Sequence, residues 1–83
     1  PGRGGRRRLP DALRGFASYR LLTDSGVTYV CALQGQELAL FDVSGERVAR
    51  KLRAPAHIND AVSHDGALFL AMRGRKPESA TLA

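Results

Sequence analysis

The chain has 83 residues, one cysteine and a formal net charge of +5. A single cysteine excludes an internal disulfide, and no apolar run approaches the roughly 18 residues that a membrane span needs. No apolar stretch of a signal peptide follows the basic start, so we expect a cytoplasmic protein without a membrane partner. The charge is uneven, because residues 1–20 carry six arginines and one aspartate, whereas residues 21–83 balance seven bases against seven acids.

The N-terminal segment, residues 1–17, is predicted to be a basic arm or linker. Residues 1–8 hold no apolar side chain, so burial cannot offset the entropy of ordering them, and we expect this part to be disordered. Their arginine-glycine composition is also typical of nucleic-acid-binding segments, whose affinity comes from phosphate contacts. The arginines concerned are Arg3, Arg6, Arg7 and Arg8. Because no aromatic residue is interleaved with them, the composition favours a solvated linker over a nucleic-acid site.

From Ser18 onward, the sequence has the texture of short strands joined by tight turns. Strands are expected over residues 19–22, 27–33, 37–43 and 47–53, and again over 58–63 and 67–72. The two middle strands of the first group are apolar on both faces, so they must be covered from both sides. The last strand of that group alternates apolar and basic residues, so one of its faces meets water. This gradient is typical of a propeller blade, whose outermost strand lines the rim.

The chain contains an internal repeat. Residues 21–32 align with residues 61–72, and Gly26 meets Gly66 in a polar turn where glycine can adopt a positive φ. A period of about 40 residues built of short strands is the period of a propeller blade. We therefore expect an all-β fold, with a four-stranded antiparallel propeller blade, the first half of a second blade and a disordered N-terminal arm. The expected boundaries are 18–56 for the full blade and 57–74 for the half blade, within a blade region of 18–76, with a tail over 77–83.

Three short motifs in the blade region have counterparts in a known family. Phe41-Asp42 stands where WD repeats carry Trp-Asp, Ala56-His57 stands where they carry Gly-His, and Ser63-His64-Asp65-Gly66 is similar to their Ser-Pro-Asp-Gly turn. Over about residues 18–74, the chain therefore resembles a degenerate WD-repeat propeller. Trp is absent, and Gln34-Gly35 stands where the family has an Asp that bonds the His. The resemblance implies structural roles for Asp42 and His57, beside the turn glycines Gly26 and Gly66.

The resemblance also implies a function. WD-repeat proteins typically hold peptides or domains on a closed ring and perform no chemistry themselves. It therefore implies a non-catalytic protein-interaction scaffold without a cofactor, whose partners are other proteins or peptides and the remaining blades of the ring. A ring needs about four blades or more, so we expect a fragment of a larger propeller. Two alternatives stay open: a blade of a quinoprotein-like or lactonase-like enzyme propeller, and nucleic-acid binding through the arginine-rich arm.

Few residues are candidates for chemistry. His57, Asp60, His64 and Asp65 are potential metal ligands, but a strand over residues 58–63 would hold its two ends about 20 Å apart. We therefore expect no metal site. Cys31 lies in the most apolar strand with no base nearby in the sequence, which indicates an inert buried thiol rather than a nucleophile.

The predicted rim strand carries four basic residues within seven positions. They are Arg47, Arg50, Lys51 and Arg53. These side chains could form a surface for an acidic partner. Charged residues on an outer strand also protect its exposed edge against pairing with another chain, and the pattern favours this second interpretation.

Overall fold

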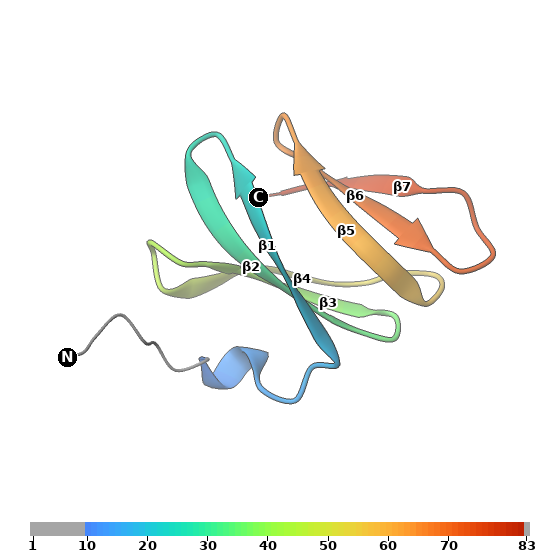
Figure 1. Ribbon diagram of the computed structural model, residues 1–83, viewed down its shortest axis with the longest axis horizontal. Helices are drawn as coiled ribbons and strands as arrows, with labels where there is room; N and C mark the ends of the chain where they lie inside the picture. The colour runs from blue at the N-terminus through green and yellow to red at the C-terminus, as the bar shows by residue number, and fades with distance from the viewer. Residues whose placement is uncertain (1–9, 83) are drawn as a thin grey trace.

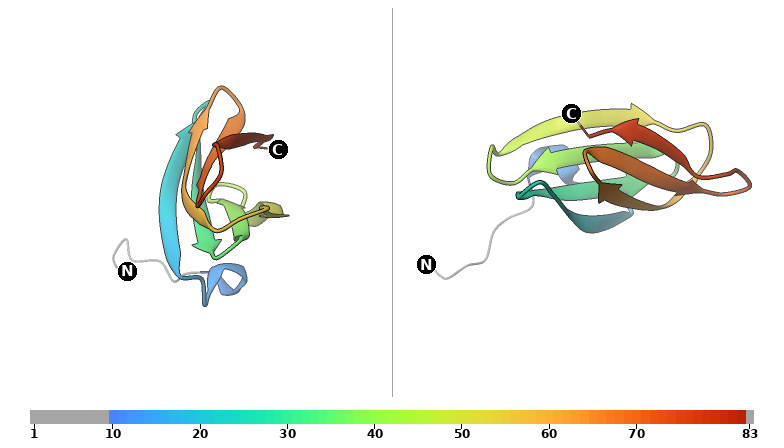
Figure 2. Two further views of the ribbon diagram at one scale, coloured as in Figure 1. Left: turned by 90° about the vertical axis from the view of Figure 1, so that its right-hand side faces the viewer. Right: turned by 90° about the horizontal axis from the view of Figure 1, so that it is seen from above.

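The computed structural model describes residues 10–82 as an all-β structure of two antiparallel sheets that lie face to face (Figures 1 and 2). The first sheet has the order β1-β2-β3-β4, with β1 (Ser18–Asp24), β2 (Val27–Gln34), β3 (Glu37–Asp42) and β4 (Arg47–Arg53). The second has the order β5-β6-β7, with β5 (Ile58–His64), β6 (Ala67–Met72) and β7 (Glu78–Thr81). A short 3-10 helix, η1 (Asp11–Leu13), precedes β1. Within residues 10–82, no helix has the length and apolar character needed to cross a membrane.

The first sheet confirms the prediction of a four-stranded antiparallel sheet, whereas the second sheet differs from its prediction. It contains three strands where two were expected, because β7 pairs with β6 inside the predicted tail over residues 77–83. Ser79 lies opposite Phe69, and the N–H of Leu82 donates to the carbonyl of Gly66 at 3.0 Å. A strand of only four residues with little apolar alternation carries a weak sequence signal, since its pairing depends on the neighbouring strand.

Residues 10–17, which belong to the predicted basic arm, pack on the first sheet. Leu13 is fully buried and clusters with Ala32 and Ala39. The hydroxyl of Tyr19 donates to the carbonyl of Leu13 at 2.6 Å. The folded body therefore starts earlier than predicted. The arginines proposed for nucleic-acid binding, namely Arg3, Arg6, Arg7 and Arg8, lie outside the described residues.

Tight turns of the same geometry join β1 to β2 and β5 to β6. Ser25 and Gly26 have φ angles of +50° and +80°, and Asp65 and Gly66 have φ angles of +50° and +78°. Positive φ at both central residues is the type I′ geometry, whose twist matches that of the flanking strands. The two glycines thus occupy equivalent positions, and the internal repeat of the sequence is also a repeat of the structure.

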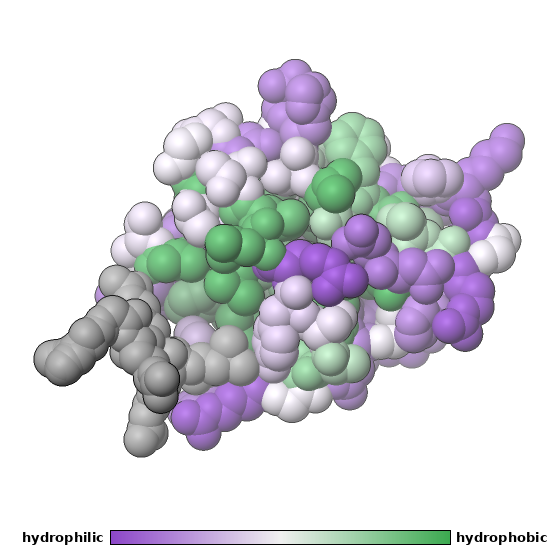
Figure 3. All heavy atoms as spheres, in the orientation of Figure 1, coloured by the Kyte–Doolittle hydropathy of each residue, from purple (hydrophilic) through white to green (hydrophobic). Residues whose placement is uncertain are grey.

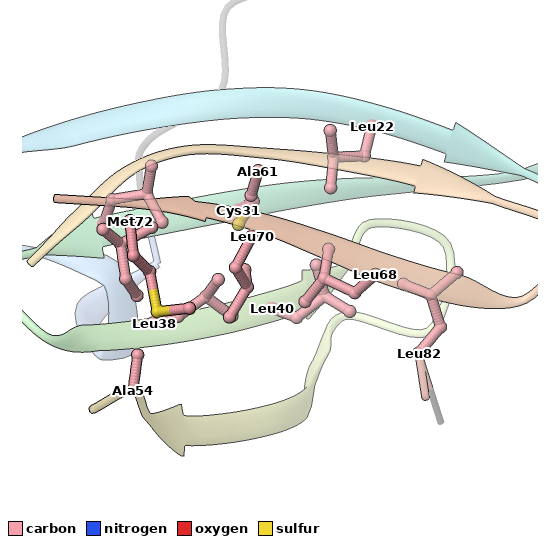
Figure 4. Packing of buried hydrophobic residues seen from close by; sticks show 12 residues of the cluster. Leu22, Cys31, Leu38, Leu40, Ala54, Ala61, Leu68, Leu70, Met72 and Leu82 are labelled. Carbon is pink, nitrogen blue, oxygen red and sulfur yellow. The ribbon is translucent and has the colours of Figure 1, made fainter. Parts of the chain in front are cut away.

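The main hydrophobic core lies between the two sheets (Figure 4). It gathers Leu22, Cys31, Leu33, Leu38 and Leu40 from the first sheet and Ile58, Ala61, Leu68, Leu70 and Met72 from the second, together with Ala54 and Leu82. A smaller cluster joins Leu13 to Ala32 and Ala39 on the opposite side of the first sheet. β2 is therefore covered on both faces over residues 31–33, as its sequence predicted, whereas residues 27–30 are only half-buried.

Each sheet has a front face and a back face, which the repeat allows us to match. The front face carries Leu22 in the first sheet and its equivalent Val62 in the second, and the back face carries Leu21 and its equivalent Ala61. Leu22 and Ala61 are 7% and 2% exposed, whereas Val62 and Leu21 are 53% and 73% exposed. The second sheet therefore places its back face on the front face of the first. The two sheets stack in the same direction and leave one open face at each end.

Candidate protein-binding site

Polar contacts between equivalent positions line the junction of β1 and β5. Arg20 Nε donates to Asp60 Oδ1 at 2.9 Å, and these residues are 40 positions apart. Thr23 and Ser63 are also 40 positions apart, and the Ser63 hydroxyl donates to the Thr23 carbonyl at 3.3 Å. β1 and β5 therefore lie side by side in the same register (Figure 1). The backbone N–H of Ala61, together with the Arg20 guanidinium, lowers the pKa of Asp60 from its ordinary value of 3.8.

Asp24 joins the ends of the two hairpins. Its carboxylate accepts the backbone N–H of Gly66 at 3.1 and 3.2 Å, and it also accepts the Ser25 hydroxyl at 3.0 Å. Asp24 is only 9% exposed, and a carboxylate withdrawn from water requires such donors. The β1–β2 turn is thereby fixed to the β5–β6 turn.

A hollow of about 370 Å³ opens between η1 and the β3–β4 hairpin. Its lining consists of apolar side chains from η1, from the segment between η1 and β1 and from the sheet, together with three charged ones: Ala12, Phe16, Leu38, Ala39, Leu52, Glu37, Lys51 and Arg53. Arg53 Nη1 donates to Glu37 Oε2 at 3.1 Å, so these two charges neutralise each other. Lys51 is exposed and forms no ion pair with any residue between Pro10 and Leu82. The hollow thus combines apolar walls with an available ammonium group.

The four basic residues of β4 do not form one surface, because successive side chains of a strand point to opposite faces. Arg50 lies on the front face, where Nη1 donates to the carbonyl and the hydroxyl of Thr81 at 2.7 Å each. Lys51 and Arg53 lie on the back face at the hollow, and Arg47 begins the strand. The structure therefore divides the predicted partner surface and connects Arg50 to β7.

The residues with predicted structural roles lie at turns and strand ends. Asp42 Oδ1 accepts the backbone N–H of Gly45 at 3.1 Å and so closes the turn before β4. The side chain of His57 is exposed, while its carbonyl accepts the N–H of Arg73 at 2.9 Å. No hydrogen bond joins the side chains of Asp42 and His57 in the described part of the chain. His57 contributes through its backbone rather than through its imidazole.

The residues considered for chemistry are dispersed. Within residues 10–82, no three His, Cys, Asp or Glu side chains gather as metal ligands. His64 Nε2 lies 3.2 Å from Asp65 Oδ2 on the surface, while Asp60 is engaged by Arg20. Cys31 is fully buried, and burial raises the pKa of its thiol to about 11. The thiol is therefore protonated at neutral pH and is a poor nucleophile.

Exposed apolar side chains gather at two places on the surface. Figure 3 shows one group over β1 and β2 and another over β5 and β6, with hydrophilic side chains between them. The large members are Tyr19, Leu21, Val62 and Phe69. The group over β5 and β6 surrounds a second hollow of about 240 Å³, lined by Asp60, Ala61, Val62, Phe69, Leu70, Ala71 and Pro77. These groups mark the two open faces of the stack.

Sequence reasoning missed the hollow beside η1, because one of its walls was assigned to the arm. The signal that could have indicated a docked segment is the presence of two large apolar residues, Leu13 and Phe16, within the predicted arm. Both pack against the first sheet, although Arg14 and Gly15 between them are not helical. The contacts of Arg20 with Asp60 and of Arg50 with Thr81 carry no comparable signal, since each joins distant parts of the chain.

Comparison with known proteins adds no relative to this picture. No protein-family model matches the chain. No curated protein and no solved structure shows significant similarity to it. The candidate site therefore stands on its own geometry: a charged, apolar-walled hollow on one sheet and open apolar faces at the two ends of the stack.

Proposed function

We infer that this chain is a non-catalytic protein-interaction scaffold and a piece of a larger WD-like β-propeller. Two features support this reading. The sheets repeat with equivalent residues 40 positions apart, and they stack front to back with equivalent strands side by side. Sheets stacked in this way around an axis form the body of a propeller.

The hollow beside η1 is the observation that carries the binding function. Its volume of about 370 Å³ falls in the range of sites that hold a small group or a few side chains. Phe16 and Ala39 contribute apolar wall, and Lys51 contributes a positive charge that no described acid neutralises. The chemistry that fits is a peptide with a large apolar side chain close to a carboxylate.

The position of the hollow favours an extended peptide. It lies against β4, which is an edge strand of the first sheet. An edge strand presents backbone groups that can pair with an added strand, while neighbouring hollows select its side chains. An acidic peptide lying along β4 would therefore place an apolar residue against Phe16 and a carboxylate at Lys51.

A selection from a displayed library of random peptides, with the full chain as target, tests this function. We expect enriched peptides that combine Asp or Glu with a large apolar residue. Lys51→Glu should weaken their binding about tenfold or more, because the rim charge reverses. Lys76→Glu is the matched control, since it makes the same charge change at an exposed position of the second sheet's last turn and should leave the Kd unchanged. Failure to enrich any peptide, or binding that Lys51→Glu leaves intact, would contradict the proposal.

A further inference from the structure

We propose that the two open faces of the stack bind each other between copies of this chain, so that the front face of the second sheet takes the back face of the first sheet of the next copy. The inference rests on the stacked-sheet part of the proposed function and not on the peptide site. The two open faces correspond to the two sides of a junction that already exists inside the molecule. That internal junction therefore serves as a template for the one between copies.

The apolar surfaces correspond position by position. Inside the molecule, Leu22 of the front face packs in the same core as Ala61 of the back face. Between copies, the equivalent positions are Val62 on the front face and Leu21 on the back face, which are 53% and 73% exposed. The internal junction thus sets a large residue, Leu22, against a small one, Ala61. The junction between copies would set Val62, of intermediate size, against the large Leu21. Phe69, the equivalent of Tyr29, adds an aromatic ring that is 39% exposed.

The charges at the junction are complementary in both arrangements. Inside the molecule, Arg20 of the first sheet pairs with Asp60 of the second at 2.9 Å. In a junction between copies, Asp60 takes the position of Arg20, and Arg20 of the next copy takes the position of Asp60. Opposite charges therefore meet again, but the acidic residue now belongs to the sheet that offers its front face and the basic residue to the sheet that offers its back face. If positions 20 and 60 carried equal charges, they would repel each other in any such junction. This exchange favours a second copy over an unrelated apolar partner.

The junction between copies can also reproduce the hydroxyl contact of Ser63 with Thr23, but it cannot reproduce the contact of Asp24 with Gly66. Ser63 donates to the Thr23 carbonyl inside the molecule, and Thr23 of the next copy has a hydroxyl for the Ser63 carbonyl. The carboxylate of Asp24 has no counterpart, because His64 stands at that position in the second sheet. The junction between copies therefore lacks the bond to a turn N–H that Asp24 makes internally, and it should be weaker and reversible.

The helix η1 covers only one end of the back face. Leu13 lies over Ala32 and Ala39, and this leaves Leu21 open. In the second sheet the position of Ala32 holds Met72, which fills the internal core. Leu13 covers Ala32 and is itself fully buried, so the part of the back face that the next copy meets is the part around Leu21.

The symmetry of the assembly follows from these contacts. The front and back faces differ, so the junction is head to tail, and such junctions close into a ring when the rotation permits. Propellers typically close with about four to eight blades. With two sheets per chain, a closed ring would hold two, three or four copies of the 8.9 kDa chain.

The experiment is light scattering after size exclusion, over a series of protein concentrations. We expect a discrete assembly of two to four copies for the wild type. Leu21→Glu and Phe69→Glu should each reduce it to a monomer with an unchanged far-ultraviolet circular dichroism spectrum, because both side chains are exposed. Val62→Glu replaces Phe69→Glu if the latter does not fold. Ser44→Glu is the charge-matched control, because it also adds one negative charge, at an exposed position of the turn before β4, and it should keep the wild-type mass.

A mixture of the two monomeric variants tests whether the front face of one copy binds the back face of another. Leu21→Glu keeps an intact front face, and Phe69→Glu keeps an intact back face, so an equimolar mixture should form a heterodimer of two chains. A monomeric wild type at every concentration, or a Leu21→Glu chain that keeps the wild-type mass, overturns the proposal. A mixture that stays monomeric overturns it as well. The hollow at Lys51 lies on the same back face, so peptide binding is measured on the monomeric Phe69→Glu variant, whose back face is intact and uncovered. Peptide binding by this variant without assembly of the wild type, or assembly without peptide binding, shows which of the two proposals fails.

Discussion

Arg20 and Asp60 occupy equivalent positions in two successive repeats, and they form an ion pair with each other at 2.9 Å. When equivalent residues of two repeats contact each other, the two sheets lie in the same orientation and without a displacement along their strands. The pair is part exposed, with side-chain exposures of 39% and 53%. Its energy is therefore modest, and its main consequence is to fix how far one sheet is displaced along the other.

The interaction between Arg20 and Asp60 can be tested by exchanging their charges. Arg20→Asp and Asp60→Arg each place equal charges opposite one another, and each should lower the free energy of unfolding by about 1 kcal/mol at low salt. The double exchange should recover part of this loss, because opposite charges meet again. Urea unfolding of the four proteins measures the coupling. Strictly additive losses in the double variant would show that the two side chains do not interact.

The pH dependence of stability should report the Asp60 carboxyl. Its pKa is lowered in the folded chain, so the folded protein binds this proton more weakly than the unfolded one. Asp60 therefore stabilises the fold at neutral pH, and this contribution is lost as the pH falls below about 4 through the folded-state pKa. The difference in unfolding free energy between the wild type and Asp60→Asn should shrink between neutral pH and acid. A gap that grows on acidification would contradict the assignment.

Asp24 should matter more than the exposed acids. Asp24→Ala leaves the part-buried N–H of Gly66 without its acceptor, which should cost about 1–3 kcal/mol in unfolding free energy. Asp24→Asn retains one acceptor oxygen and should cost less. Asp11→Ala is the control, because the Asp11 side chain is 91% exposed and its removal should change stability by less than about 0.5 kcal/mol. Equal losses at the two positions would show that the bond to Gly66 contributes nothing.

The hairpin turn predicts a strong effect of a branched residue. Gly66 has a φ of +78°, which a β-branched side chain adopts only with strain, so Gly66→Val should destabilise the fold by roughly 1–3 kcal/mol. Gly66→Asn should be milder, because Asn tolerates positive φ. Gly5→Val, in the N-terminal segment, serves as the comparison and should have the smaller effect. Thermal melting measures all three, and equal melting temperatures for the two valine variants would contradict the repeat alignment.

Cys31 should act as an internal probe of unfolding. It is fully buried with a pKa raised to about 11, so a thiol reagent should not modify it in the folded chain near neutral pH. Modification should become rapid once urea unfolds the protein. The check is the rate of thiol labelling against urea concentration, compared with the loss of circular dichroism. Fast labelling of the fully folded chain would show that the β2 strand opens locally.

The strands of the first sheet were predictable because their signals are local. Gly26 and Gly66 identify the turns, and the apolar residues on both sides of β2 indicate a strand covered on two faces. β7 was assigned to the tail and η1 to the N-terminal arm for the opposite reason. Both elements are too short to show a period, and Leu13 becomes a core residue only when Ala32 and Ala39 lie beneath it.

The candidate site was predictable only in part. The sequence singled out Lys51 and its basic neighbours, but alternation along β4 separates Arg50 from Lys51, and Phe16 joins Lys51 from a segment assigned to the arm. A charge cluster in sequence does not reveal which of its members face the same way until the register of the strand is known.

The sequence by itself determined the all-β class, the strands of the first sheet and the internal repeat. Those features follow from side-chain periodicity and turn chemistry within short stretches of chain. Only the tertiary structure decided which faces are covered, that Arg20 meets Asp60, and that Leu21 and Val62 are left open. Each of these depends on contacts between residues some 40 positions apart, whose partners are fixed by how the two sheets stack and not by local preference.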